Sequence, residues 1–322
     1  MMSAVRNDDI ARAAGILRSG GIVAFPTETV YGLGADALNP QAVERIFAIK
    51  RRPPDHPLIV HLPNVSYLEG WACDIPRTAY RLAEKFWPGP LTLILKRAAI
   101  APDNVTGGQD SVGLRVPGHP VALALLEKFG GAVAAPSANR FGHVSPTRAE
   151  HVREELGSEV DMILDGGPCQ VGLESTIVSL LDARPLILRP GVISRSMLAE
   201  ALGEEVETGT AEKINLRAPG MLASHYAPRT PLHKVPSVEL YERAFALVTQ
   251  GQRVGVLTRQ EGAHKPGLYY YLLPDDPKDY AHELYDTLRK ADARRLDMLL
   301  IEELPQDEAW LAVRDRVTRA AT

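Results

Sequence analysis

Cationic side chains cluster where a predicted helix meets a predicted strand. In the segment KRRPPDHPLIVH, Lys50, Arg51 and Arg52 close a helical pattern, and a proline-rich loop leads into an apolar run that ends at His61. Arginine offers a planar fork of donors to phosphate oxygens, lysine offers a point charge, and the prolines lower the entropy of holding both. We therefore expect a polyphosphate site here. The alternative is a solvated charge run, because the helix dipole alone favours cations at a helix C-terminus.

A further cation, Arg115, interrupts an apolar strand pattern in VGLRVP. A lone arginine that faces inward from a strand is costly unless it is paired. It therefore meets either an internal carboxylate or an anionic ligand, and the residues alone do not decide between these two. His61 also closes an apolar run, and by itself this position is more typical of a core histidine than of a ligand-binding one.

The segment PTETVYGLGADA, residues 26–37, is predicted to be a loop after the first strand. Its Thr27 and Thr29 hydroxyls either satisfy local backbone groups or contact a substrate. The GLGADA portion matches the dinucleotide fingerprint G-x-G-x-x-A. However, the preceding strand ends too early and no helix follows directly, so NAD binding is not expected.

More serines and another arginine follow later strands. In APSANRFGHVSPT, Ser145 precedes a proline and is predicted to be a helix N-cap, whereas Ser137 has no such structural explanation. GLESTIVSL and ILRPG place Ser175 and Arg189 at the ends of two neighbouring strands. The sequence around these serines lacks the G-x-S-x-G and S-x-x-K patterns of serine hydrolases. It also lacks the G-x-x-x-x-G-K-[ST] loop of P-loop ATPases, so a nucleotide would need another scaffold.

These segments require alternating strands and helices to position them. From about residue 10 to 200, short apolar β-branched runs alternate with helical patterns, which is typical of an α/β domain. Two helices are well marked, one at 40–50 with Asn39 as its cap and one at 120–129 followed by two glycines. Several successive strands have no helix between them, so we expect a mixed sheet. The expected strands are 22–25, 58–61, 91–95, 112–116, 132–135, 162–164, 177–181 and 186–188.

The length of 322 residues suits two domains. We assign residues 1–202 to the first α/β domain, 203–235 to a linker rich in proline and glycine, and 236–322 to a smaller Rossmann-like α/β domain. In the smaller domain we expect strands at 254–257, 268–273 and 298–301, and helices at 238–250, 280–293 and 308–320.

Composition excludes several classes of protein. The net charge of -4 argues against broad electrostatic binding to nucleic acid. Cys73 and Cys169 are the only cysteines, and outside any Cys/His cluster they are predicted to be buried thiols. The sequence has no run of roughly 18 apolar residues, so no membrane span is expected. Residues 1–20 resemble an amphipathic helix rather than a signal peptide, so we expect a cytoplasmic protein.

A series of segments occurs in the order and spacing of a known family. FPTETVYGLG, KRRPPDHPLIVH, WPGPLTLIL, VGLRVP, APSANRFGHVSPT, GLESTIVSL and ILRPG together resemble the YrdC-like domain of threonylcarbamoyl-AMP synthases. The resemblance covers about residues 10–200, and SHYAP with the extra α/β unit is similar to the long, two-domain form of the family. It implies an α/β protein with a twisted mixed-sheet YrdC-like domain followed by a smaller Rossmann-like domain.

The resemblance also implies two sets of site residues. L-threonine would bind at Thr29, His61, Arg115, the backbone of Ala135 and Ser175. ATP would bind at Arg52, His56, Ser111, Ser137, Ser145, Arg189 and Tyr226. Lys50 and Arg52 would be the catalytic pair that faces the phosphates. The chain departs from the family pattern at Arg51, where glycine is common, at His56, where asparagine is common, and at Ser111, where threonine is common.

The reaction implied by the resemblance joins L-threonine, bicarbonate and ATP into threonylcarbamoyl-AMP and pyrophosphate. Mg2+ would arrive with ATP, without protein side chains as metal ligands. A downstream threonylcarbamoyl transferase complex would take the product for N6-threonylcarbamoyladenosine formation in tRNA. The threonine amine would become a carbamate whose oxygen attacks the α-phosphorus. Such a step needs positioning and charge neutralisation rather than a protein nucleophile.

The linker is predicted to close over the occupied cleft as a lid, with Tyr226 on the nucleotide. It has few apolar residues, so we expect it to be ordered only when ligands are bound. The alternative is that Tyr226 anchors the linker against either domain.

Two other functions remain as alternatives. One is a double-stranded RNA-binding or ribosome-associated module, which the net charge disfavours, as it disfavours direct tRNA binding. The other is a carbamoyl transferase similar to hydrogenase-maturation proteins, which are longer and carry zinc-finger and acylphosphatase segments.

Overall fold

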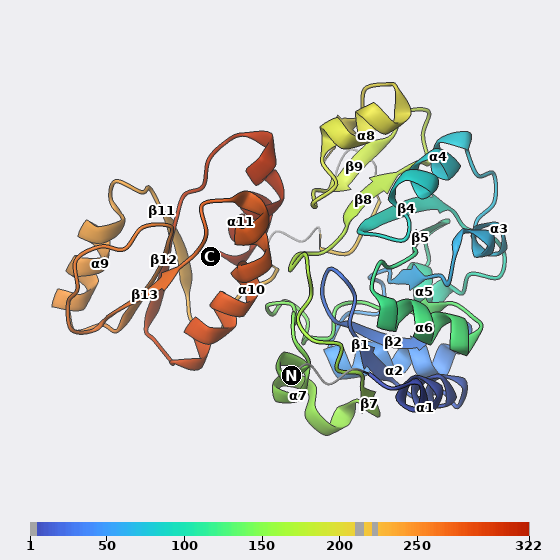
Figure 1. Cartoon of the computed structure of the whole chain (residues 1–322), viewed down its shortest axis with the longest axis horizontal. Helices are drawn as coiled ribbons and strands as arrows, with labels where there is room; N and C mark the ends of the chain where they lie inside the picture. The colour runs from blue at the N-terminus through green and yellow to red at the C-terminus, as the bar shows by residue number, and fades with distance from the viewer. Residues whose placement is uncertain (1–4, 210–215, 221–224, 322) are drawn as a thin grey trace. The chain divides into compact units, whose positions relative to one another are not determined.

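The computed structural model describes residues 5–209, 216–220 and 225–321 (Figure 1). The chain divides into two compact units, residues 1–141 with 145–221 and residues 142–144 with 222–322. The boundary at 221/222 falls inside the stretch predicted to be a linker. In the described part of the chain, no helix is long and apolar enough to cross a membrane.

A mixed sheet forms the centre of the first unit and contains ten strands within the described residues. Its order is β10-β9-β8-β4-β5-β3-β6-β2-β1-β7, with β3 and β5 parallel and β4 and β5 antiparallel. The mixed sheet confirms the expectation from strands that follow one another without a helix. The strands are β1 Val23–Phe25, β2 Gly32–Asp36, β3 Ile59–His61, β4 Leu91–Lys96, β5 Ser111–Arg115, β6 Val133–Ala134, β7 Met162–Ile163, β8 Thr176–Ser179, β9 Leu186–Arg189 and β10 Glu207–Thr208.

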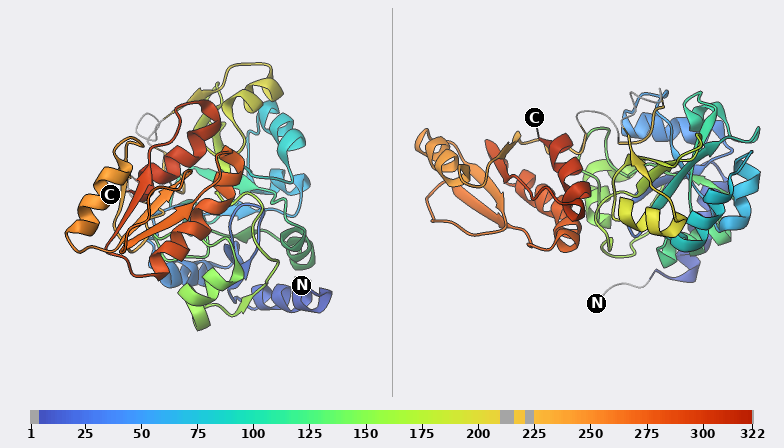
Figure 2. Two further views of the ribbon diagram at one scale, coloured as in Figure 1. Left: turned by 60° about the vertical axis from the view of Figure 1, so that its left-hand side comes forward. Right: turned by 90° about the horizontal axis from the view of Figure 1, so that it is seen from above.

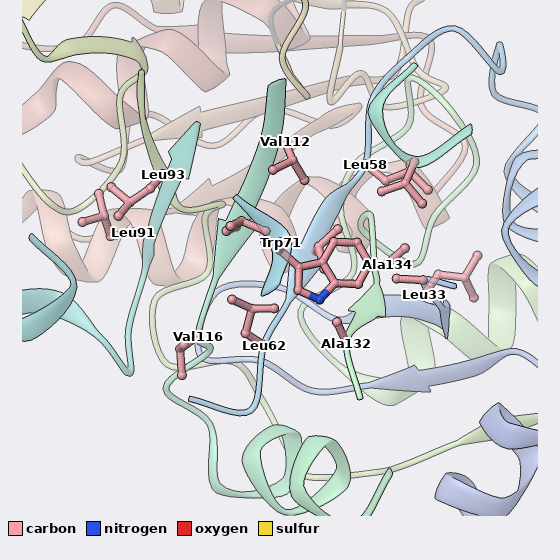
Figure 3. Close-up of a cluster of buried hydrophobic side chains, with 14 of the residues drawn as sticks. Leu33, Leu58, Leu62, Trp71, Leu91, Leu93, Val112, Val116, Ala132 and Ala134 are labelled. Atoms are coloured by element: carbon pink, nitrogen blue, oxygen red, sulfur yellow. The ribbon is translucent and has the colours of Figure 1, made fainter. Parts of the chain in front are cut away.

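Helices pack on this sheet around two apolar clusters. α1 and α6 pack against each other and against β1, in a cluster that contains Phe25 and Leu125. A larger cluster joins α2, α4 and α8 to the other sheet face, and Figure 3 shows Trp71 there among strand residues such as Leu33 and Leu93. The helices are α1 Asn7–Arg18, α2 Pro40–Lys50, α3 Leu68–Trp71, α4 Arg77–Phe86, α5 Asp103–Thr106, α6 Pro120–Phe129, α7 Ala149–Leu156 and α8 Arg195–Leu202.

The bounds of α2 follow from its end residues. The Asn39 side chain accepts a hydrogen bond from Ala42 N at 3.1 Å, and Pro40 occupies the first turn, where its missing N–H costs nothing. The helix ends at Arg51, which has a left-handed φ of 54°. This conformation favours glycine. The glycine that the resemblance implies at position 51 would adopt this conformation more readily than the arginine present.

One strand lies where the sequence predicted a loop. Residues 32–36 of the segment 26–37 form β2, which pairs with β1 and β6. Its glycines hide the strand signal, because glycine is depleted in strands. Gly34 is required by packing, since a Cβ there would lie 2.7 Å from the Phe25 ring and 2.8 Å from Val133. Residues 26–31 remain a loop, and Ala37 lies in the turn after β2.

Three smaller expectations were also wrong. The N-cap of α7 is Arg148 rather than Ser145, whose hydroxyl instead donates to Glu174 Oε1 at 2.6 Å. Leu232–Val235, placed in the linker, forms strand β11 of the second unit. Cys73 is half-buried, whereas Cys169 is buried as predicted.

The described residues of the second unit contain a four-stranded parallel sheet of the order β11-β14-β12-β13. α9 lies on one face, and α10 and α11 lie on the other (Figure 1; Figure 2). This arrangement agrees with the Rossmann-like α/β unit expected from the sequence. Its elements are β11 Leu232–Val235, α9 Leu240–Thr249, β12 Val254–Thr258, β13 Leu268–Leu272, α10 Pro277–Ala293, β14 Met298–Glu302 and α11 Leu311–Ala320.

Candidate active site

Polar side chains gather on one face of the large sheet, along β3, β5, β4, β8 and β9. The strand register places His61 of β3 beside Arg115 of β5. Because side chains alternate along a strand, Ser111 and Arg115 point to the same face. Thr92 of β4 also lies on this face, hydrogen-bonded to Ser175 before β8. The candidate site is therefore built on rigid strands rather than on loops alone.

Arg115 meets an internal carboxylate, which decides one alternative that the sequence left open. Its Nη2 lies 2.7 Å from Oε1 of Glu28, and the two side chains are 4% and 7% exposed. Its Nε donates to the carbonyl of Gly89 at 3.2 Å. Among the described residues, Nη1 of Arg115 makes no hydrogen bond. Arg115 therefore keeps donors for an anionic ligand beside its buried partner.

His61 lies next to this ion pair and is buried, with 4% exposure. Burial, together with the charge of Arg115, lowers the pKa of His61 to about 3. Its ring meets the Phe25 ring edge to face at 6.0 Å, and within the described chain Nδ1 has no hydrogen-bond partner. A neutral imidazole with an open nitrogen is able to hydrogen-bond a ligand.

Arg189 binds several backbone and side-chain groups of the same end of the sheet. Its Nη2 donates to Ser175 Oγ at 3.0 Å, and its Nε donates to Ser175 O at 3.0 Å. Its Nη1 donates to Pro219 O at 3.0 Å. The Ser175 hydroxyl also lies 2.7 Å from the Thr92 hydroxyl. Arg189 thus joins β8, β9 and a residue of the predicted linker.

Lys50 does not extend into open space in this structure. It is 2% exposed, and its ammonium donates to the carbonyls of Ser137 at 2.5 Å and Asn139 at 2.6 Å. Burial, with a smaller contribution from the charge of Arg52, holds the pKa of Lys50 well below its usual value. Lys50 therefore fixes the loop after β6, on which Ser137 lies.

Arg52 and His56 share an aromatic neighbour. The Arg52 guanidinium lies 5.5 Å from the centre of the Phe141 ring, and the His56 ring meets the same ring edge to face at 5.3 Å. Arg52 Nη2 also donates to Pro57 O at 3.0 Å. Burial and the charge of Arg52 lower the pKa of His56, so its imidazole is neutral at pH 7.

Most residues predicted to bind ATP lie at one end of the strands, and most of those predicted to bind threonine through their side chains lie at the other end. Ser111 and Arg115 begin and end β5, which at about 3.3 Å per residue spans about 13 Å between them. The loop before the parallel strand β3 carries Arg52 at the Ser111 end. Ser137, which follows the antiparallel strand β6, lies there too. His61 and Ser175 lie at the Arg115 end.

Arg189 and Thr29, both predicted to bind ligands, make hydrogen bonds to other protein groups in the structure. Arg189 was predicted to bind the nucleotide but contacts Ser175, which was predicted to bind threonine. Thr29 and Thr27 bond to each other at 2.8 Å, and Thr27 Oγ1 donates to Val30 O at 2.6 Å. The local backbone role of Thr27 is therefore confirmed, whereas a ligand contact of Thr29 stays a prediction. Ala135 is buried, and its N–H donates to Ile59 O at 2.9 Å.

Part of the predicted linker lies on the polar face of the first unit. Leu216 and Ala218 are each 7% exposed and pack against isoleucines of β3, β4 and β8. The Gln109 side chain accepts from Arg217 N at 2.7 Å and donates to Arg217 O at 3.0 Å. These contacts fix residues 216–218 on the first unit in the structure described here, and the expectation that the stretch orders only when ligands are bound stays a prediction. Residues 210–215 and 221–224 lie outside the described residues.

Tyr226 belongs to the second unit. It is 1% exposed, stacks on Tyr285 at 5.7 Å and lies 5.3 Å from the Arg316 guanidinium. These contacts agree with the alternative that Tyr226 anchors the linker, here in the second unit. Its contact with a nucleotide stays a prediction.

Ser111 borders a cavity of about 620 Å3 at its end of β5. Lys96, Gln109 and Leu216 also line this cavity. Within the described residues, no three or more histidine, cysteine, aspartate or glutamate side chains are arranged to hold a metal ion.

Comparison with known proteins identifies the family. A family model described as "Telomere recombination" matches residues 15–191, and one described as "Threonylcarbamoyl-AMP synthase, C-terminal domain" matches residues 193–322. A threonylcarbamoyl-AMP synthase of Bacillus subtilis is 42% identical, over 97% of this chain and 92% of its own length. The chain belongs to the threonylcarbamoyl-AMP synthase family. This result confirms the resemblance recognised in the sequence.

Another family member, from Pyrococcus abyssi, is 40% identical over 96% of this chain and 93% of its own length. The crystal structure of P. abyssi Sua5 complexed with L-threonine matches with a TM-score of 0.91 and 38% identity. That match covers 98% of this chain and 95% of the other. The two-unit α/β architecture is therefore that of the family's long form.

Sequence reasoning missed two residues of the site. Glu28, the partner of Arg115, lies in the loop 26–31 but was not singled out. The signal was present, because a lone inward arginine calls for a nearby acid and PTETVY contains one. Gln109, which holds the segment around Arg217, gave no such signal in a polar turn.

Proposed function

We propose that the protein synthesises threonylcarbamoyl-AMP from L-threonine, bicarbonate and ATP, with release of pyrophosphate. The observation that carries this proposal is the similarity, at 40–42% identity over nearly the whole chain, to curated threonylcarbamoyl-AMP synthases. The relative solved with L-threonine supports threonine as the amino-acid substrate. Arg115 lies at one end of β5, and Ser111 and Arg52 lie at the other. This distance fits a long ligand that joins an amino acid to a nucleotide.

The Arg115 end of the sheet is the proposed threonine site. The free donors of Arg115 suit the threonine carboxylate, because a guanidinium binds a carboxylate through two parallel hydrogen bonds. His61 is neutral at pH 7 and therefore adds a hydrogen bond without a second positive charge. Ser175 offers a hydroxyl already oriented by Thr92 and Arg189.

The loop 50–57 is the proposed triphosphate site. Arg52 would neutralise charge that develops as the carbamate oxygen attacks the α-phosphorus and pyrophosphate leaves. Lys50 would act through the Ser137 loop in the conformation described here, because its ammonium is engaged by two carbonyls. Ser111, Ser145 and His56 are further proposed nucleotide contacts. Catalysis then consists of alignment and charge neutralisation, without a covalent protein intermediate.

We propose that Mg2+ is bound with ATP. The residues at the triphosphate end fit a metal that is held by ATP rather than by protein side chains. Lys50, Arg52 and His56 are not anionic, and the carboxylate of Glu174 accepts a hydrogen bond from Ser145. The phosphates themselves would supply most of the oxygen ligands. When bound, the ion supplies neutralisation of the leaving pyrophosphate.

The product is a reactive acyl adenylate, so a second enzyme must use it soon after release. We propose that a threonylcarbamoyl transferase complex consumes it to form N6-threonylcarbamoyladenosine in tRNA. Since ATP and tRNA are both cytoplasmic, we propose the same location for this protein.

Pyrophosphate release with single-substrate omissions tests the proposed function. The proposal predicts release only when L-threonine, bicarbonate and ATP are all present. Release with carbamoyl phosphate in place of threonine and bicarbonate would support the carbamoyl transferase alternative instead. Tight binding of double-stranded RNA without any release would support the RNA-binding module.

A further inference from the structure

Glu28 is a buried carboxylate at the Arg115 end of the site. It is not among the residues that the sequence predicted to bind a ligand. Its oxygen Oε1 lies 2.7 Å from Arg115 Nη2, and Gly89 O accepts from Arg115 Nε at 3.2 Å. Nε and Nη2 form one edge of the planar guanidinium. The ion pair with Glu28 and the hydrogen bond to Gly89 O therefore engage the same edge, and the Nη1 donors are turned away from it.

The surroundings of Glu28 restrict its carboxylate to this position. The backbone of Glu28 is fixed, because Val171 N donates to Glu28 O at 2.7 Å. Gly118 packs directly on the carboxyl group, so that an added Cβ there would lie 3.4 Å from both Cδ and Oε1. Backbone at Gly118 thus packs against the carboxylate beside Arg115.

Stability alone is a weak reason for such a pair. Removing two charges from water costs several kcal/mol, and well-packed apolar residues often replace a buried ion pair without loss of stability. A guanidinium fixed on one edge, in contrast, lowers the entropy cost of binding a carboxylate on its other edge. The arrangement is therefore better explained by orientation of Arg115 than by folding.

We propose that Glu28 is a positioning residue for the amino-acid substrate. It holds the Arg115 guanidinium so that the Nη1 donors meet the carboxylate of L-threonine. This inference rests on the proposed function and adds a residue that acts through Arg115 rather than on the substrate.

The test compares Glu28→Gln with a matched control. Glutamine keeps the length and one acceptor oxygen but removes the charge that fixes Arg115. The control is Glu302→Gln in the second unit, where Glu302 is also 7% exposed and its Oε1 lies 2.9 Å from Arg259 Nε. Both variants remove a buried glutamate from an arginine, which is buried in the case of Arg115 and half-buried in the case of Arg259, so both lower the thermal midpoint. Only Glu28 lies in the proposed site.

Steady-state kinetics should separate the two variants. Glu28→Gln is expected to raise the KM for L-threonine about tenfold, the equivalent of about 1.4 kcal/mol, with kcat and the KM for ATP within about twofold of wild type. Glu302→Gln should leave all three constants unchanged. If Glu28→Gln does not fold, Glu28→Asp, which keeps the charge but withdraws the oxygen by one methylene, should raise the same KM.

Calorimetry with a ligand that lacks the carboxylate completes the test. L-threoninol should bind wild type and Glu28→Gln with equal affinity, because it has no group for Arg115 to orient. The positioning role is refuted if L-threonine binds the variant as tightly as wild type, or if threoninol loses as much affinity as threonine. A wild-type protein that binds no threonine would instead refute the proposed function.

Discussion

Burial of His61 predicts that the first unit is sensitive to acid. The folded-state pKa is about 3 because of burial and the neighbouring charge of Arg115, whereas an imidazole in the unfolded chain titrates near 6.5. Below pH 6.5 the unfolded chain therefore binds a proton that the folded protein does not. The contribution of His61 to the free energy of unfolding is fully present above pH 6.5. It is lost progressively as the pH decreases from 6.5 toward 3.

The size of the effect follows from the two pKa values. At pH 5 the unfolded imidazole lies about 1.5 pH units below its pKa and the folded one is still neutral. At about 1.4 kcal/mol per unit, the loss relative to pH 8 is about 2 kcal/mol. For a unit of this size, that corresponds to a decrease of about 4–8 °C in Tm.

Urea unfolding at pH 8 and pH 5 of wild type and His61→Gln measures this difference. A Trp310→Phe background leaves Trp71 and Trp87 as fluorescent reporters of the first unit, since the two units need not unfold together. Other titrating groups cancel between the two proteins. Wild type should lose about 2 kcal/mol more than the variant. Equal losses would show that His61 is not held neutral and would refute the reasoning.

Three further predictions concern other parts of the site. Arg52→Ala should weaken ATP at least tenfold and L-threonine less than twofold by calorimetry; equal weakening would contradict the division of the site into two ends. Gln109→Ala removes two hydrogen bonds to the backbone of Arg217, so tryptic cleavage after Arg217 should be about tenfold faster, and an unchanged rate would show that Gln109 does not hold the segment. Gly191→Ala would place a Cβ 2.4 Å from Thr176 N, so the variant should lose threonine-dependent turnover and Tm should fall, and wild-type values would contradict this packing.

The sequence predicts helices of the first unit well where the end residues carry the signal. Asn39 and Pro40 begin α2, and Gly130 ends α6 in a left-handed conformation, as the capping rules require. Strand β2 was not predictable in the same way. Its Gly34 is required by close packing against Phe25, which is a tertiary contact that no local pattern shows.

The candidate site was predictable in its residue types but not in its pairing. Arg115, His61 and Ser175 were singled out, and the structure brings them together on one sheet face. The sequence could not show which charged side chains already bind other groups of the protein. Lys50 binds two backbone carbonyls, and Arg115 binds Glu28, because strands and loops distant in sequence meet there.

Mass spectrometry of the product decides whether the protein makes threonylcarbamoyl-AMP. The purified protein is incubated with 13C-labelled bicarbonate, L-threonine and MgATP, and the products are analysed at once because acyl adenylates hydrolyse. The expected product is an adenylate whose mass includes threonine and one labelled carbon, together with pyrophosphate. Pyrophosphate with an unlabelled adenylate, or no threonine-containing adenylate at all, would contradict it.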